Sequence, residues 1–491
     1  MYRTLRDLTP RDSDYPPRTF ELDVLGRVLA GKLYDVLPHA FHDERDHGGE
    51  YIPLRKRRPT VRYNLCRVVV EDAVSLLFGD GRFPIIECAD EATRGALVRL
   101  IEDANLPSVM NEAAIAGSVG SVAILMRVLG GRVFFEALPT LYLKPEWDPS
   151  APDTLLRVIE KRKVRGDALA AAGYMIAEDK LATEHWFGRI WDAQAETWLL
   201  PQPVGAEGSL QPDPSRTVWH GLGFVPMVWI RNLPGPSETG AGEDGASTFA
   251  RAIDTQIELD YQLSQAGRGL KYSSDPTLLI KEPAAGADGE IIKSAGNALV
   301  VSEKGDAKLL EIGGTAADAV ISYAGTLRDL ALESMHGNRA SADKLTVAQS
   351  GKAMELMHQP LIWLADRMRG PYGDHGLLEL LRMVIRARGR MPLRFRDEPM
   401  PEFPAGARVA LRWPPWFHPT EQDQLEQAQG LGALRASGLI SRETGVKVVA
   451  VTHDIPDPAA EIRRIAADEA EQDARAKAQA AQVSGTEPMG G

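Results

Sequence analysis

Two stretches of the chain have helical spacing but carry only one narrow apolar stripe each. The stripe positions are Phe249, Ile253, Ile257 and Tyr261 in the first stretch, and Val320, Tyr323, Leu327 and Leu330 in the second. A helix with so narrow a stripe is not expected to bury itself within its own chain, whereas copies of it can close a ring by packing on their neighbours. The two stretches therefore favour an assembly of several copies.

Short strand-like runs separate these two helices. They cover residues 278–281, 290–293, 298–302 and 309–312, and turns containing glycine lie between them. Such runs predict a small β module with exposed edges, suited to pairing with neighbours or docking a partner. A self-contained hairpin insertion is the alternative interpretation.

The first half of the chain is expected to be α+β. Residues 61–79 and 91–104 have helical patterns, 83–88 is a short strand, and 122–128 and 133–138 flank Gly130 and Gly131 as a hairpin. Further strand-like runs are 155–164, 181–191 and 225–230. Residues 1–60, rich in Arg, Asp, Pro and His, are interpreted as an arm, and 232–247, rich in Gly, Pro and Ser, as a domain boundary.

The second half is predicted to be mainly helical after the polar stretch 337–351. A long helical run is broken at 370–373 by glycine and proline and resumes over 377–388, and 407–413 is strand-like. Short helices are expected at 421–437 and 442–451, with Gly438 ending the first and Ser441 capping the second. The last helix, 458–482, is charged and alanine-rich, and a mobile tail follows.

Composition places the chain among folded globular proteins. Its 491 residues are 44% hydrophobic and 25% charged, and they offer material for about three domains. Two cysteines suit a reducing, intracellular setting, and neither a membrane span nor a signal sequence is predicted. The net charge of −12 disfavours a protein that grips nucleic acid tightly by neutralising phosphates.

Residue patterns typical of enzymes are incomplete. Ser350, Gly351 and Lys352 lack the upstream glycine of a phosphate-binding loop, and 117–121 has Val119 where a nucleophile elbow has serine. The cluster His42, Asp43, Glu44, Asp46 and His47 could hold a divalent cation, but a solvated charge run explains it better. Glu71 and Asp72 are adjacent on a helix, diverge, and most simply face water. No enzyme, cofactor or metal site is predicted.

The order of these elements resembles the portal protein family of tailed bacteriophages. The resemblance covers most of the chain and rests on four motifs. They are NLCRVVVEDAVSLLFG (64–79), GLGFVPMVWIRN (221–232), SGKAM (350–354) opening the long helix, and ASGLISRET (436–444) followed by 457–468. The helix, β module, helix pattern lies between the second motif and the third.

The resemblance implies an α+β portal fold assembled as a ring of twelve. Its parts would be an N-terminal arm (1–60), a wing (61–246), a first stem helix (247–270), a clip (271–314), a second stem helix (315–336), a candidate tunnel loop (337–351), a long kinked helix with the rest of the wing (352–416), a helical crown (417–482) and a flexible tail (483–491). The eight stripe residues would pack the stem. Asp288, Gly289, Glu290 and Lys293 would dock partners at the clip.

The resemblance further implies a channel for double-stranded DNA at one capsid vertex, used in packaging and ejection. Arg339, Lys344 and Lys352 are the candidate channel cations, and 368–375 is the competing loop. The expected partners are the terminase large subunit, a head-tail adaptor, and major capsid and scaffold proteins, in the virion and, during assembly, the host cytoplasm.

Two other classes remain open from the sequence. One is a different virion structural or scaffold protein, which is expected to be mostly helical and to lack the β module. The other is a nucleic-acid enzyme of the packaging machinery, which predicts metal- or phosphate-binding motifs and divalent-cation-dependent nuclease activity.

Overall fold

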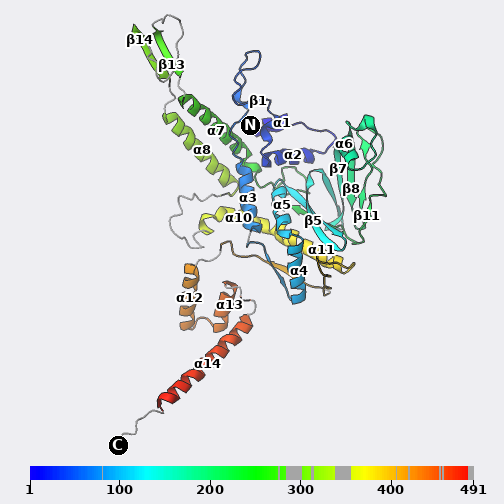
Figure 1. The fold of residues 1–491 in the computed structure, drawn as a ribbon, viewed down its shortest axis with the longest axis vertical. Coiled ribbons are helices and arrows are strands. Elements are labelled where there is room, and N and C mark those ends of the chain that lie inside the picture. The colour runs from blue at the N-terminus through cyan, green and yellow to red at the C-terminus, as the bar shows by residue number, and fades with distance from the viewer. Residues whose placement is uncertain are drawn as a thin grey trace. The chain divides into compact units, whose positions relative to one another are not determined.

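The computed structural model describes residues 1–79, 81–274, 277–283, 301–310, 314–337, 355–404, 406–417, 421–452, 455 and 458–484. The chain divides into two compact units. The first comprises Met1–Arg339 and Gln359–Pro414, and the second comprises Ala340–His358 and Pro415–Gly491. The mixture of helices and sheets agrees with the predicted α+β class (Figure 1).

The N-terminal residues belong to the core of the first unit, which corrects the expectation of an arm. They form α1 (Tyr2–Leu8), α2 (Pro17–Leu29) and η1 (Leu33–Val36), and the short strands β1 (His39–Ala40) and β2 (Arg57–Arg58) pair in parallel. Buried apolar side chains of α1, α2 and η1 join the main hydrophobic cluster. The buried Arg57 guanidinium is satisfied by the carbonyl of Ile52, with Nε 2.8 Å from the oxygen. The segment was interpreted as an arm because its many charged residues obscure the apolar positions in the sequence pattern.

Helices α3 (Leu65–Phe78), α4 (Glu91–Asp103) and α5 (Leu106–Gly117) follow, and the first two confirm the predicted helical patterns. The Asn64 side chain caps α3 by accepting a hydrogen bond from the Arg67 backbone at 3.2 Å, and Gly79 ends the helix.

The predicted glycine hairpin is confirmed. Strands β4 (Ser121–Leu129) and β5 (Arg132–Pro139) pair antiparallel, with Leu129 opposite Arg132. Gly130 and Gly131 have φ values of 57° and 79°, the left-handed conformation that a two-residue turn of this kind requires. Strand β12 (Met227–Arg231) pairs with the other edge of β4.

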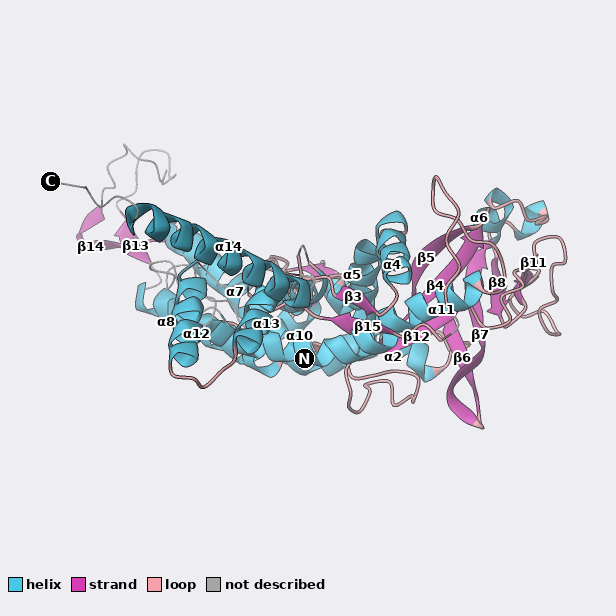
Figure 2. Ribbon diagram, turned by 90° about the horizontal axis from the view of Figure 1, so that it is seen from below, coloured by secondary structure: helices cyan, strands magenta, loops and turns pink. Residues whose placement is uncertain are grey.

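A second, larger sheet lies next in the chain. Its strands are β6 (Leu143–Asp148), β7 (Ala151–Arg165), β8 (Glu184–Trp191), β9 (Ala195–Trp198), β10 (Gln202–Pro203) and β11 (Val218–Trp219). Helix α6 (Gly166–Ala171) joins β7 to β8, and the order along the sheet is β11-β9-β8-β7-β6, with β10 beside β8. Figure 2 shows these strands gathered at one end of the first unit.

The segment expected to be a domain boundary is instead built into the first unit. Arg18 forms a bidentate pair with the buried carboxylate of Asp244, with both nitrogen-to-oxygen distances at 2.7 Å. The Ser121 hydroxyl donates to the same carboxylate, and Asn232 donates to the carbonyl of Ala246. The glycine and proline residues of 232–247 therefore belong to a loop that packs against the core.

The helical run near residue 370 is continuous, which corrects the predicted break. Helix α10 (Gln359–Met368) passes into a π-helix (η7, Arg369–Leu377) and then α11 (Leu378–Arg388). A π turn accommodates Pro371, which cannot donate the regular helical hydrogen bond. The glycines allow close packing, because a Cβ at Gly373 would lie 2.2 Å from Trp413 Cζ2. Trp413 follows β15 (Val409–Arg412), which pairs with β3 (Ile85–Cys88).

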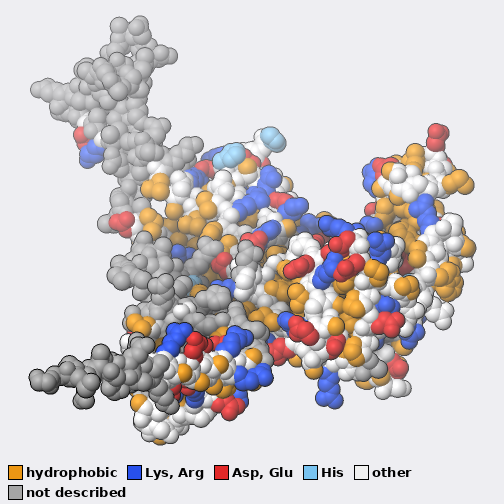
Figure 3. All heavy atoms as spheres, turned by 60° about the horizontal axis from the view of Figure 1, so that its bottom comes forward, with side chains coloured by type: hydrophobic (Ala, Val, Ile, Leu, Met, Phe, Trp, Pro, Cys, Tyr) orange, Lys and Arg blue, Asp and Glu red, His pale blue; other side chains and the backbone are white. Residues whose placement is uncertain are grey.

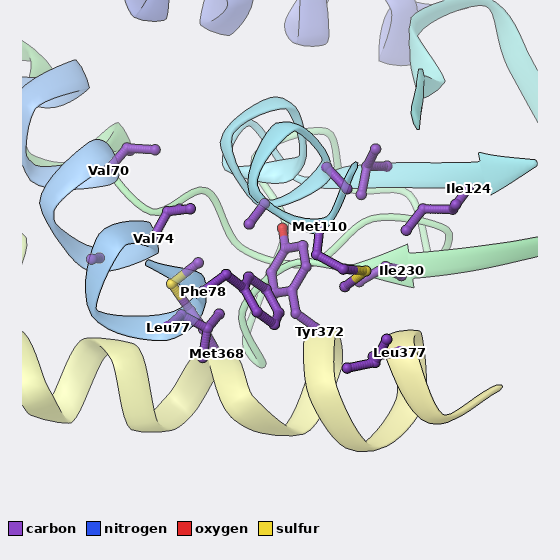
Figure 4. Packing of buried hydrophobic residues seen from close by; sticks show 14 of the residues in the cluster. Val70, Val74, Leu77, Phe78, Met110, Ile124, Ile230, Met368, Tyr372 and Leu377 are labelled. Carbon is purple, nitrogen blue, oxygen red and sulfur yellow. The ribbon is translucent and has the colours of Figure 1, made fainter. Parts of the chain in front are cut away.

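Tyr372 lies at the centre of this core. Its ring is fully buried among Met110 of α5, Ile230 of β12 and the end of α3 (Figure 4). Its hydroxyl donates to Asn232 Oδ1 at 2.9 Å. The π-helix therefore packs against α3, α5 and the three-stranded sheet, and it is hydrogen-bonded to the loop that follows β12.

A helical pair completes the first unit. A short turn, η5 (Ala250–Ala252), leads into α7 (Ile253–Ser274), and α8 (Gly314–Ser334) returns alongside it. Between them β13 (Thr277–Pro283) and β14 (Val301–Leu310) form an antiparallel hairpin. Figure 1 shows α7 and α8 side by side, with the hairpin at the end that points away from the rest of the unit. The order of helix, β element and helix is confirmed. The predicted runs 298–302 and 309–312 are not separate strands, because β14 is continuous over Val301–Leu310, and the predicted strand 290–293 lies outside the described residues.

The second unit contains α12 (Glu421–Ala436), α13 (Arg442–Thr452) and α14 (Pro458–Ser484), as the sequence predicted. Gly438 has a φ of 74°, and the Ser441 hydroxyl accepts from the Thr444 backbone at 3.1 Å. Both predicted helix boundaries are confirmed. The tail from residue 485 lies outside the described residues.

The close approach of α5 to η7 gives a test of this core. A Cβ at Gly117 would lie 2.3 Å from Tyr372 Oη and 3.0 Å from Val122 Cγ1. Gly117→Ala is therefore expected to lower the free energy of unfolding by about 1–3 kcal/mol, measured by denaturant titration.

Gly26 in the interior of α2 is the matched control, since nothing lies within 4 Å of a Cβ there. Gly26→Ala is expected to leave stability unchanged or to raise it by up to about 1 kcal/mol. Equal effects of the two substitutions would contradict the described packing.

Candidate functional site

The N-terminal end of α7 with the turn before it, residues 249–261, is buried inside its own chain, and we call this segment the root of α7. Phe249, Ile253 and Ile257 are fully buried and Tyr261 is nearly so, and all four belong to the main hydrophobic cluster. These four stripe residues are therefore already packed against α1, α3, η1 and other parts of the same unit. The expectation that their stripe is left for neighbouring copies is corrected for this end of the helix.

The buried face of α7 is wider than its apolar stripe because it includes polar residues with distant partners. Gln256 Oε1 accepts from the Cys66 backbone at 2.9 Å, and Ser264 Oγ accepts from the Val61 backbone at 3.0 Å. Asp260 accepts from the Tyr34 hydroxyl at 2.7 Å and from the Tyr63 backbone at 2.8 Å. These contacts fasten the residues before α3 to the root of α7.

Asp260 is the most strongly perturbed acid of this network. Burial raises its pKa to about 7, against the opposing influence of the hydrogen bonds from Tyr34 and Tyr63 and of the Arg62 charge. Burial, together with the nearby Asp260, also raises the pKa of Tyr34, so this hydroxyl stays a donor. Asp260 lies outside the apolar stripe, so the stripe alone does not indicate that it is buried. Its neighbour Tyr261 in the stripe was the signal that the buried face extends this far.

Helix α8 buries one side and exposes two flanks. Ala324 and Leu327 pack on Leu259 of α7 in a small separate cluster. Tyr323, Leu330 and Ile321 have exposed fractions of 46%, 51% and 60%. Of the predicted second stripe, Leu327 is thus buried within the chain, Val320 is half-buried, and Tyr323 and Leu330 face outward.

The two exposed flanks lie on different sides of α8. Tyr323 and Leu330 are seven residues apart, about two helical turns, and so share a flank. Ile321 is nine residues from Leu330, about two and a half turns, which puts it on the opposite flank. Large apolar side chains are therefore available on both sides of the helical pair.

The predicted channel and clip residues mostly lie outside the described residues. This holds for the channel candidates Arg339, Lys344 and Lys352 and for the clip residues Asp288, Gly289, Glu290 and Lys293. What the structure describes of the clip is the β13–β14 hairpin, where Leu279 is exposed and Lys308 lies 3.5 Å from Asp306.

The competing channel loop is not a loop. Residues 368–375 are helical, Met368 and Tyr372 are fully buried, and His375 Nε2 lies 3.2 Å from the carbonyl oxygen of Trp229. The choice of this segment as a channel-lining loop is therefore wrong. Its glycine and proline serve the π-helix.

Several of the residues considered for chemistry have local contacts in the described part of the chain. No group of three or more His, Cys, Asp or Glu side chains there could hold a metal ion, and His42 merely lies 3.4 Å from Asp43. Glu71 pairs with Arg67 at 2.7 Å. Gly117 and its neighbours serve close packing, as described above. Figure 3 shows basic, acidic and apolar side chains interspersed on the face it presents.

Comparisons with known proteins leave the family open. No family model and no curated protein matches the chain. Two solved structures are similar at 12% identity, each over 79% of this chain and 88% of the other. One is the virion of a native gene transfer agent particle, with a TM-score of 0.35, and one is the neck of an empty particle of that kind, with a TM-score of 0.37. Scores this low identify neither fold nor function.

No helix among the described residues is both long and apolar enough to cross a bilayer.

The buried Asp260 gives a pH-dependent test of the α7 root. Its pKa in the folded chain, about 7, lies above the ordinary value of 3.8, so the folded state holds this proton more tightly. The stability that this proton confers is complete below pH 4 and is lost as pH rises toward 7. Wild type is expected to lose stability relative to Asp260→Asn over this range, measured by denaturant titration at each pH.

Glu258→Gln on the exposed side of the same helix is the control, and its stability difference from wild type is expected to be flat over the same range. A flat difference for Asp260→Asn as well would show that the carboxylate is not buried as described.

Proposed function

We propose that the chain is a bacteriophage portal protein, whose copies form the ring-shaped channel at one capsid vertex. The observation that carries the proposal is the pair α7–α8, rooted in the core at one end and bearing a β-hairpin at the other. Exposed apolar side chains lie on both flanks of α8. The order of the sequence motifs supports the same proposal.

Two different apolar flanks suit a closed ring. In head-to-tail assembly each copy presents one surface to the neighbour on its left and another to the neighbour on its right. The Tyr323 and Leu330 flank of one copy would pack on the Ile321 flank of the next. Because α7 is rooted by buried contacts, the stem would be held rigidly and α8 would supply the contact between copies.

The charge of the chain is compatible with a passage for DNA. Each copy carries a net charge of −12, so a ring of twelve would on balance repel phosphates and let a duplex slide. Arg339, Lys344 and Lys352 would give transient, sequence-independent contact at a constriction. The hairpin end would dock the terminase large subunit and later a head-tail adaptor, while capsid and scaffold proteins would surround the ring.

The two alternative classes are less well supported. A mostly helical scaffold protein is disfavoured by the two larger sheets and the β13–β14 hairpin. A packaging nuclease would need a metal or phosphate site, and the described residues provide no metal-binding cluster. We therefore expect no catalytic activity, which an assay with duplex DNA and Mg²⁺ would check.

Assembly is tested on the exposed flank. The double variant Tyr323→Asp and Leu330→Asp is expected to stay folded but to give no rings, because carboxylates would be buried without partners between copies. Native mass spectrometry and negative-stain imaging measure the outcome. Leu156→Asp with Met175→Asp, which changes two exposed apolar residues elsewhere in the first unit, is the control. Normal rings from the flank variant would overturn the assigned contact.

Channel contact is tested by replacing Arg339 and Lys344 with serine. Ring assembly is expected to persist, while packaging efficiency or DNA retention changes because two rings of positive charge are lost. Packaging assays with purified components measure the effect. Unchanged packaging and retention would remove these residues from the channel.

A further inference from the structure

The segment after α11 lies against the β4–β5 turn, and these two stretches of the chain together carry four arginines. They are Arg132, Arg390, Arg394 and Arg396, and three of them come from seven consecutive residues. The Arg394 backbone donates to the Gly131 carbonyl at 2.9 Å, and a Cβ at Gly131 would lie 3.3 Å from Arg394 Cγ and 3.6 Å from the Pro392 carbonyl oxygen. These contacts hold the segment beside Arg132.

The local backbone turns the arginines outward. Leu393 and Phe395 are buried, whereas the alternating residues Arg394 and Arg396 are exposed. Arg132 lies over the Phe134 ring, with its guanidinium carbon 5.0 Å from the ring centroid. Arg394 donates only to the backbone carbonyls of residues 395 and 396.

None of these four guanidinium groups forms an ion pair within the described residues. The nearby acids are engaged elsewhere: Asp397 and Glu398 pair with Arg99, and Asp103 accepts from the Arg396 backbone. Arg386 pairs with Glu379, and Arg388 lies 3.8 Å from Glu402. Arg386 and Arg388 lie in the last turn of α11, where a positive charge interacts favourably with the helix dipole. This interaction does not explain Arg132, Arg390, Arg394 and Arg396, which lie outside α11.

We infer that these four arginines form a second contact for the phosphate backbone of double-stranded nucleic acid, on the surface of the first unit. Guanidinium groups bind phosphate oxygens in bidentate geometry and keep their charge at every relevant pH. A polar hollow of 480 Å³ lies beside Arg390, one of the four, and is lined also by Arg388 and Glu402. It gives room for a phosphate group. The contact carries no sequence information, because it reaches only the backbone.

An acidic protein segment is the other polyanion that such a surface could attract. Stable protein interfaces are built on a central cluster of buried apolar anchors, and the apolar side chains exposed beside the β4–β5 turn are Leu129 and Phe134. Phe134 is already covered in part by Arg132. The observations therefore favour phosphate over protein. The inference does not depend on the proposed ring, since each chain carries the whole surface.

The experiment measures binding of the full-length protein to a 30-base-pair duplex by fluorescence anisotropy at several salt concentrations. Four phosphate contacts predict a slope of log affinity against log salt of about −3.6. The variant with Arg132, Arg390, Arg394 and Arg396 all replaced by Gln is expected to bind at least tenfold more weakly, with a shallower slope. The double variant Arg390→Gln and Arg396→Gln is expected to fall between the two.

The matched control removes four exposed arginines that each pair with a neighbouring carboxylate, namely Arg67, Arg94, Arg165 and Arg475. Its affinity is expected to stay within twofold of wild type, and circular dichroism melting checks the fold of every variant. Wild-type affinity in the quadruple variant, an equal loss in the control, or no duplex binding at low salt would overturn the inference. Binding of polyglutamate as tightly as the duplex, lost in the same variant, would assign the surface to an acidic protein instead.

Discussion

The anchoring of α7 is the constraint on which the rest of the structure depends. Ile253 and Ile257 are withdrawn completely from solvent, and Asp260 is held among donors from η1 and from the residues before α3. Burying each aliphatic side chain stabilises the fold by about 1.5–3 kcal/mol, whereas burying a carboxylate opposes it unless hydrogen bonds compensate. Asp260 has such bonds and still retains a raised pKa. The root of the helical pair is thus firmly fixed and sensitive to pH.

The first half of α7 holds the helical pair to the core, whereas α8 has large exposed apolar side chains on two flanks. Its inner side is occupied by Ala324 and Leu327, and its end rejoins the core through Ala331 and Met335. The remaining flanks carry Tyr323, Leu330 and Ile321. The two helices therefore differ in role. Buried contacts of α7 hold the pair to the core, and α8 has exposed apolar side chains that other molecules can contact. Head-to-tail assembly uses two different surfaces of each copy, and the proposed ring is its closed form.

Local patterns in the sequence predicted local structure well. The Gly130-Gly131 turn, the end of α3 at Gly79 and the Gly438 and Ser441 boundaries all depend on residues within a few positions of one another, so their spacing is sufficient. The start of α3 was placed four residues too early, at residue 61. The order of helix, hairpin and helix was also readable, because each element has its own periodicity.

The errors arose where distant partners decide the outcome. Asp260 lies outside the apolar stripe, and its partner Tyr34 is 226 residues away in the chain. The N-terminal segment looked like an arm because its charges mask Leu5, Leu22 and Leu25, which are buried against other elements. At Gly373 and Gly376 the glycines permit contact with Trp413 and Ile230 and do not end the helix. The surface formed by Arg132 and the arginines of 390–396 was missed because Arg132 comes from a hairpin far from 390–396 in sequence.

The central claim, that copies of the chain assemble through the two flanks of α8, is tested most directly by an electron-microscopy map of the purified full-length protein. We expect a ring with a central hole, in which Tyr323 and Leu330 of each copy pack against Ile321 of the next. A monomer, or a ring in which these side chains face solvent, would contradict it.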